Sequence, residues 1–89
     1  MEKQVTTQTL HGVVHSLGPL FYGKNSSVKR LLTIKFAGLR EMQYVGAYLI
    51  GDDATNGDIR LGRPIVIKYL FTSGMERVIV GFSYEEEFQ

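Results

Sequence analysis

Residues 64–84 read Pro-Ile-Val-Ile-Lys-Tyr-Leu-Phe-Thr-Ser-Gly-Met-Glu-Arg-Val-Ile-Val-Gly-Phe-Ser-Tyr. Two runs rich in β-branched and aromatic residues, 64–72 and 77–84, flank a short segment that contains Gly74, which is the pattern of a β-hairpin. Both faces of the first run are partly apolar, as expected where a small barrel closes or another chain packs on the sheet. The rings that we expect in the core are those of Tyr69, Phe71 and Phe82.

The segment before this hairpin begins with another predicted strand. Residues 9–16 alternate so that Leu10 and Val14 point to the same face. Gly12, in the middle of this strand, indicates a bend or a bulge. Residues 17–27 carry turn-forming residues at both ends, and we expect them to form a loop or a distorted continuation of the strand.

Two more strands are predicted in the middle of the chain. The apolar residues of 28–37 fit either one face of a helix or one face of a strand, and the β-branched residues and the neighbouring β pattern favour a strand. A turn at 38–41 leads into a strand at 42–50, in which Tyr44 and Tyr48 share a face. The predicted total is five strands.

A polar segment separates the third strand from the closing hairpin. Residues 51–58 contain the pair Asn56-Gly57, which argues against more than a single helical turn. Because 89 residues can support only one hydrophobic core, we expect a single barrel domain over 1–84, followed by a short acidic tail at 85–89.

The composition narrows the class of protein. With 44% hydrophobic and 21% charged residues, the chain has enough apolar material to fold. It has no cysteine, and it contains no apolar stretch that would suit a signal peptide or a membrane span. We therefore expect a cytoplasmic protein without a membrane segment and without a cofactor.

The charges are distributed unevenly along the chain. Residues 3–40 contain six basic residues and no acidic one, whereas residues 41–89 contain four basic and eight acidic residues. The uneven distribution fits an anionic partner for the first half, although a short chain also clusters charges by chance. The basic residues of the first half are Lys3, Lys24, Lys29, Arg30, Lys35 and Arg40.

The order of these features resembles the oligonucleotide/oligosaccharide-binding (OB) fold, and in particular small bacterial and phage single-stranded DNA-binding proteins. The resemblance covers residues 9–84 and implies an all-β, five-stranded Greek-key barrel. The helix that the family places between the third and fourth strands is shortened or missing here, because 51–60 leaves little room for it. A small barrel of the SH3 kind is the rival fold. The stretches that carry the resemblance are Leu10-His-Gly-Val-Val14, Gly23-Lys-Asn-Ser-Ser-Val-Lys-Arg30, Leu31-Leu-Thr-Ile-Lys-Phe36 and Leu61-Gly-Arg-Pro-Ile-Val-Ile67.

The resemblance implies a nucleic-acid surface on the second and third strands, flanked by loops. Such a surface needs cations that follow the phosphates and rings on which bases stack, and it requires no base-specific hydrogen bonds. The expected ligand is single-stranded DNA or RNA, bound without strong sequence specificity. The candidate binding residues are Phe21, Tyr22, Lys24, Lys29, Arg30, Lys35, Tyr44 and Tyr48.

The C-terminal residues form a separate candidate site. Glu85, Glu86, Glu87 and Phe88 are similar to the acidic, Phe-ending tips through which single-stranded DNA-binding proteins recruit protein partners. Here Gln89 follows the phenylalanine, and no flexible linker precedes the acids. We expect this tail to bind a protein partner.

The sequence offers no convincing catalytic or metal site. Residues 18–25 nearly match the phosphate-binding P-loop, but Asn25 replaces the hydroxyl residue that coordinates magnesium. On a strand, His11 and His15 would stand about 13 Å apart, too far to share a metal ion. The acidic pair Asp52-Asp53 fits a solvated turn better than a cation site. We therefore predict a binding protein and not an enzyme.

A protein-interaction or assembly module is the alternative function. In that interpretation the tyrosine and phenylalanine faces form a subunit interface, and the chain is a homo-oligomer. Phosphate binding weakens steeply as salt rises and an apolar interface does not, so the salt dependence separates the two functions.

Overall fold

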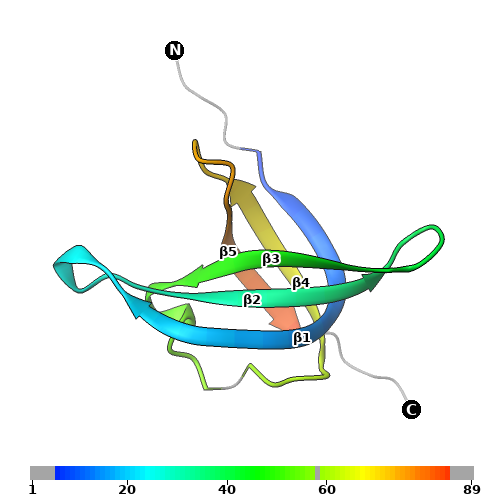
Figure 1. Cartoon of the computed structure of the whole chain (residues 1–89), viewed down its shortest axis with the longest axis horizontal. Helices are drawn as coiled ribbons and strands as arrows, with labels where there is room; N and C mark the ends of the chain where they lie inside the picture. Colours follow the sequence, from blue (N-terminus) through cyan, green and yellow to red (C-terminus); the bar gives the residue numbers. More distant parts are fainter. Residues whose placement is uncertain (1–5, 58, 85–89) are drawn as a thin grey trace.

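The computed structural model of the chain describes residues 6–57 and 59–84. These residues form five β-strands and two short 3-10 helices (Figure 1). In chain order the elements are β1 (Gln8–Tyr22), η1 (Lys24–Ser26), β2 (Val28–Ala37), β3 (Met42–Ile50), η2 (Gly51–Asp53), β4 (Pro64–Phe71) and β5 (Arg77–Tyr84).

The five strands close into a barrel in the order β1-β2-β3-β5-β4. β1 pairs antiparallel with β2 on one side and with β4 on the other, and β3 pairs in parallel with β5 at Tyr48 and Val78. Figure 1 shows β1, β2 and β3 side by side, with β4 and β5 crossing behind them. The predicted all-β, OB-fold-like barrel of five strands is confirmed, and the rival fold of the SH3 kind is set aside.

β1 is the strand that joins the two parts of the barrel, and it is much longer than predicted. Its first half pairs with β4, and Val13 pairs with Pro64 of β4 and with Lys35 of β2, so the strand changes partners there. The neighbouring Gly12 allows this change of partners, because a Cβ atom at Gly12 would meet the Ile34 side chain and lie 2.7 Å from the carbonyl oxygen of Lys35. Gly12 therefore marks a close approach of β1 to β2, and the register shifts of β1 lie after it, between Val14 and Ser16 and between Leu17 and Leu20.

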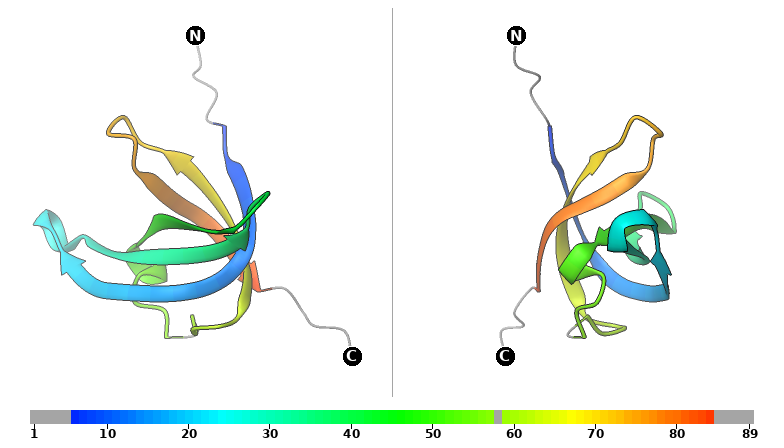
Figure 2. Two further views of the ribbon diagram at one scale, coloured as in Figure 1. Left: turned by 45° about the vertical axis from the view of Figure 1, so that its right-hand side comes forward. Right: turned by 90° about the vertical axis from the view of Figure 1, so that its left-hand side faces the viewer.

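The second half of β1 pairs with β2 as a long hairpin. Its register shifts between Val14 and Ser16 and again between Leu17 and Leu20, so the segment after residue 16 is a distorted continuation of the strand. Figure 2 shows the end of this hairpin extending past the barrel. Of the two alternatives predicted for 17–27, the distorted continuation is correct as far as Tyr22, and the turn-forming Gly18-Pro19 pair lies inside an irregular strand, not in a turn.

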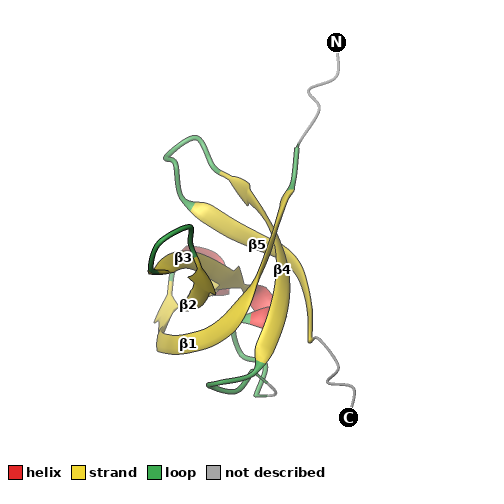
Figure 3. Cartoon of the chain, turned by 90° about the vertical axis from the view of Figure 1, so that its right-hand side faces the viewer, coloured by secondary structure: helices red, strands yellow, loops and turns green. Residues whose placement is uncertain are grey.

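The remaining elements follow the predicted pattern closely. Residues 28–37 form strand β2 and not a helix, and β4 and β5 form the predicted antiparallel hairpin. Between β3 and β4, the described residues contain only the single 3-10 turn η2 and loop segments (Figure 3). The expected shortening of the helix at this place is therefore confirmed.

The core lies inside the barrel and is built by alternate residues of every strand. Four residues of β2 and β3 are fully buried: Leu32, Ile34, Ala47 and Leu49. Tyr69 of β4 is also buried, and its hydroxyl donates a hydrogen bond of 3.2 Å to Oε1 of Gln8 on β1. The buried apolar residues are Val14, Leu32, Ile34, Ala47, Leu49, Ala54, Ile59, Ile65, Ile67, Tyr69 and Ile79.

The core prediction for Phe71 is wrong. Tyr69 is buried and Phe82 packs against the core, but Phe71 is 39% exposed. Phe71 is the last residue of β4, where the strand passes the end of the barrel, and its ring contacts the edge of the Tyr69 ring with 5.7 Å between the centroids. The guanidinium of Arg77 lies 5.0 Å from the Phe71 ring centroid. The alternation of side chains along β4 correctly predicts the side of the strand on which Phe71 lies. It does not show that the barrel interior ends before this residue.

Candidate functional site

The outward side of β1, β2 and β3 gathers most of the predicted binding residues. Because Leu32 and Ile34 point into the core, the odd-numbered residues of β2 point outward, and by the same argument the even-numbered residues of β3 do so. The register places Tyr44 beside Lys35 and Tyr48 beside Leu31. We call this surface the outer face and define it by Phe21, Lys29, Leu31, Lys35, Tyr44, Gly46, Tyr48 and Ile50.

The rings of the outer face differ in exposure. Tyr44 is 54% exposed and Phe21 is 51% exposed, so both offer a ring surface to a ligand. Tyr48 is half-buried, and the ammonium group of Lys29 lies 4.7 Å from the centroid of its ring, a cation–π contact. Phe21 is the β1 neighbour of the same Lys29. Each of the three rings of the outer face therefore has a lysine beside it.

His15 lies beside the outer face and was not among the predicted binding residues. Its ring packs edge-on against the Tyr44 ring, with 4.7 Å between the centroids and 61° between the planes. The register shift between Val14 and Ser16 occurs at this residue. Alternation puts His15 on the side opposite the buried Val14, but no pattern in the sequence revealed the register shift or the contact with Tyr44.

The space between the two tyrosines of β3 is shallow because Gly46 lies there. A Cβ atom at Gly46 would lie 3.2 Å from Cδ1 of Leu31, so the Leu31 side chain occupies the place that a larger residue would take. The floor between Tyr44 and Tyr48 is thus an apolar surface of Leu31, which is compatible with a flat ligand.

Arg30 has a different environment from the other predicted cations. It is half-buried and lies on the side of β2 that faces the core. Its Nε donates a hydrogen bond of 2.6 Å to the carbonyl oxygen of Gly18. Gly18 lies within the irregular part of β1, between Leu17 and Leu20, where the pairing with β2 is interrupted. Arg30 therefore stabilises the distorted hairpin through this carbonyl.

The end of the β1–β2 hairpin carries the remaining predicted residues. Tyr22 and Lys24 are both exposed there. The turn is closed by a hydrogen bond of 2.8 Å from the Gly23 amide to the Ser27 carbonyl, and Asn25 adopts a left-handed conformation with φ of 62°. Asparagine accepts this conformation more readily than most residues.

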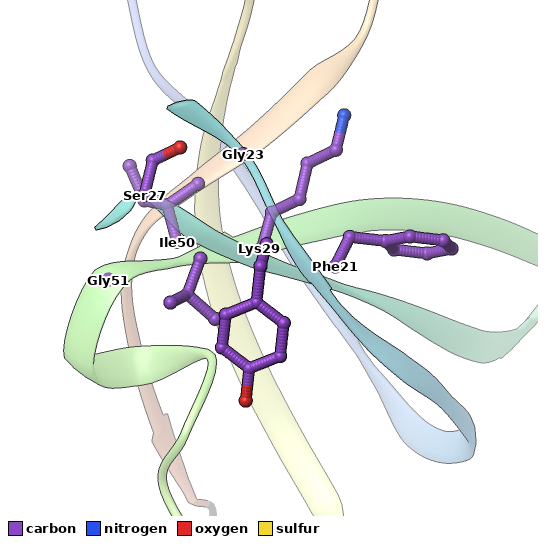
Figure 4. A pocket seen from close by; sticks show the side chains of 8 residues that line it. Phe21, Gly23, Ser27, Lys29, Ile50 and Gly51 are labelled. Carbon is purple, nitrogen blue, oxygen red and sulfur yellow. The ribbon is translucent and has the colours of Figure 1, made fainter. Parts of the chain in front are cut away.

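A pocket of about 580 Å³ lies where this hairpin end meets the end of β3 (Figure 4). We call it the hairpin pocket. Ile50, which is 47% exposed, belongs to its lining and was not among the predicted residues. Ile50 lies an even number of residues from Tyr44 and Tyr48 on β3, so it points to the same side of the strand. This spacing could have identified it from the sequence. The lining residues are Phe21, Tyr22, Gly23, Ser27, Val28, Lys29, Ile50 and Gly51.

Other kinds of site receive no support from the described residues. Within residues 6–57 and 59–84, no group of three or more histidine, aspartate or glutamate residues could hold a metal ion. In the same part of the chain, no helix is long and apolar enough to cross a membrane. The predicted partner-binding residues Glu85, Glu86, Glu87 and Phe88 lie outside the described residues.

No protein-family model and no curated protein matches this sequence. Among solved structures, the chain is similar to a small single-stranded DNA-binding protein from Streptomyces coelicolor. The match has a TM-score of 0.67 and covers 94% of this chain and 95% of that chain, at 15% sequence identity. At this identity the similarity establishes the fold.

Proposed function

We propose that this protein binds single-stranded nucleic acid, and single-stranded DNA in the first place, along the outer face. Rings would stack with the bases and cations would contact the phosphates, so binding would need little sequence specificity. The similarity in fold to a protein described as a single-stranded DNA-binding protein supports this ligand.

The observation that carries the proposal is the placement of rings and cations on one exposed face. Tyr44 pairs with Lys35, and Phe21 pairs with Lys29, so each exposed ring has a lysine on the neighbouring strand. Stacking on an aromatic side chain is worth about 1–3 kcal/mol per base. Two such rings would contribute about 2–6 of the roughly 8 kcal/mol that micromolar binding requires, and phosphate contacts would supply the rest.

The length of the face sets the size of the site. Six residues separate Tyr44 from Ile50 along β3, which corresponds to about 20 Å at the usual rise of a strand. Such a distance accommodates only a few nucleotides, at the lower end of the roughly 4–16 nucleotides that OB-fold domains cover. We expect affinity to rise with oligonucleotide length until this span is filled.

The test is fluorescence anisotropy with a labelled mixed-sequence single-stranded 20-mer, titrated with protein at low and at moderate salt. A duplex of the same sequence and an RNA 20-mer are the comparison ligands. Salt-sensitive binding that prefers a single strand is the expected result. A folded protein that binds none of these ligands at low salt would show that the proposal is wrong.

A protein-assembly function is the second candidate, favoured by exposed apolar side chains on several elements. Leu39 in the β2–β3 turn is fully exposed, and Leu61 and Val80 are also exposed. In this alternative the chain is a homo-oligomer that forms through apolar contacts. Its mass in light scattering would then be independent of salt, and nucleic acid would have no effect on it.

We further propose that the C-terminal acidic residues contact a protein partner, and that the chain acts in the cytoplasm by binding without catalysis. The support for the tail is its sequence alone, three acids followed by a phenylalanine. Removal of residues 85–89 should leave DNA affinity equal to or higher than that of the full chain, because the tail adds negative charge.

A further inference from the structure

The hairpin pocket is continuous with the outer face. Phe21, Lys29 and Ile50 belong to both, one from each of the three strands that build the face. Figure 4 labels all three among the residues that line the pocket. A ligand that follows the outer face toward the end of the hairpin therefore reaches a concave site after the flat one.

We propose that the hairpin pocket binds one unpaired base of the nucleic-acid strand, while neighbouring bases stack on Tyr48 and Tyr44. This inference rests on the proposed function and adds a base-binding site to it. The outer face alone would hold bases only by their flat surfaces, whereas the pocket would enclose one base on several sides.

The chemistry of the lining fits a nucleobase. Phe21, Val28 and Ile50 provide apolar walls, and the absence of side chains at Gly23 and Gly51 leaves the backbone accessible. Small-molecule sites of this kind are mostly apolar with a few polar groups and have volumes of about 300–1,000 Å³. A volume of about 580 Å³ lies within that range.

The charges around the pocket indicate how the strand would enter. Lys29 lines the pocket, and Lys24 is exposed on the hairpin turn beside it. On the other side, Asp52 and Asp53 follow Gly51 in η2. A phosphate is therefore favoured on the side of the hairpin and disfavoured beside η2, so the base and not the phosphate would point toward β3.

Lys29 connects the pocket with the stacking surface. Its side chain lines the pocket while its ammonium group lies 4.7 Å from the Tyr48 ring centroid. The phosphate that joins a base in the pocket to a base on Tyr48 would thus pass close to this ammonium group. One lysine would serve both positions, and the base in the pocket would then be the immediate neighbour of the base on Tyr48.

The test is an abasic scan of a single-stranded oligothymidine of the shortest length that gives full affinity, because a longer strand can shift its register. Each position in turn lacks its base, and affinity is measured by anisotropy. The variant Ile50→Trp places an indole in the pocket. The matched control Val80→Trp adds the same ring at an exposed position of β5, which is not part of the outer face.

We expect an abasic residue near one end of the oligonucleotide to weaken binding roughly fivefold to a hundredfold in the native protein and in Val80→Trp. In Ile50→Trp the same abasic residue should cost less than about twofold, because the indole already occupies the pocket. A photo-cross-link from 5-iodouracil at that position to Phe21 or Tyr22 is the expected second result.

The outcomes separate the two proposals. Binding with equal abasic penalties at all positions, or with the same penalty in Ile50→Trp as in Val80→Trp, would overturn the base-binding pocket and leave the outer face in place. Complete lack of binding to the intact oligonucleotide would overturn the pocket and the proposed function together.

Discussion

Lys29 is the residue whose contacts connect most of the outer face. It neighbours Phe21 on β1, contacts the Tyr48 ring and lines the hairpin pocket. Each phosphate contact on a single strand contributes about −0.7 to the slope of log K against log salt. We expect Lys29→Ala to weaken DNA binding and to reduce the magnitude of this slope by about 0.7. Lys68→Ala on β4, also an exposed lysine, is the matched control and should leave the slope unchanged.

Tyr44 is the more exposed of the two β3 tyrosines on the outer face. Tyr44→Ala should weaken binding by about 1–3 kcal/mol, the usual contribution of one stacked base. Tyr44→Phe keeps the ring and should retain nearly native affinity. Equal losses in both variants, measured by anisotropy, would point to the hydroxyl and contradict stacking. Because the side chain is 54% exposed, neither change should greatly alter the free energy of unfolding.

At the scale of residues, alternation along a strand predicts much of the site but not all of it. It correctly puts Tyr44 and Tyr48 on the side opposite the buried Ala47 and Leu49. It also puts His15 on the side opposite the buried Val14, but it cannot show which ring His15 meets, because the register of β1 on β2 shifts between Val14 and Ser16. The contact of Arg30 with a backbone carbonyl is equally hidden, since the irregular segment of β1 that supplies it has no clear signature.

Gly12 lies where β1 passes from its pairing with β4 to its pairing with β2, and the packing of these strands depends on its lack of a side chain. Gly12→Ala would push a methyl group against the buried Ile34 and the Lys35 carbonyl. Overpacking of this kind typically costs about 1–3 kcal/mol. We expect that loss in the free energy of unfolding by urea. Gly81→Ala on β5 is the matched control, because a Cβ atom there has nothing within 4 Å. A small effect in both variants would show that β1 and β2 can separate to admit the methyl group.

At the scale of elements, the predicted strands agree with the structure wherever the pattern is regular. β3 and β5 begin and end at the predicted residues, and 28–37 is a strand although its apolar residues also fit a helix. Phe71 is exposed because it is the last residue of β4, where it pairs with Arg77 at the start of β5. The extension of β1 to Tyr22 depends on its pairing with β2, a contact between distant residues that local propensity does not contain.

The whole barrel should respond to its ligand through linkage. A ligand that binds only the folded state at one hundred times its Kd stabilises that state by about 2.7 kcal/mol. For a domain of this size, this energy corresponds to a rise in Tm of roughly 10–20 °C. We expect this rise with single-stranded oligonucleotide and a much smaller one with duplex at equal concentration. Thermal denaturation followed by circular dichroism measures both, and equal shifts would contradict the preference for single strands.

At the scale of the molecule, the sequence predicts five strands and one core, but the order of the strands in the barrel came from the resemblance to a known fold. The parallel pairing of β3 with β5 and the return of β4 to β1 join residues far apart in the chain. The hairpin pocket depends on this assembly, because it brings the β1–β2 turn against the end of β3. No single continuous stretch of the sequence forms the pocket.

The tyrosines are divided between the interior and the proposed ligand surface. Tyr69 is buried and Tyr84 packs against the core, whereas Tyr44 and Tyr22 are exposed and Tyr48 lies half-buried on the outer face. The protein has no tryptophan, so its ultraviolet emission comes from these five phenols. Bases stacked on the outer rings would quench part of that emission and leave the interior part. The unlabelled protein therefore carries its own optical reporter of binding.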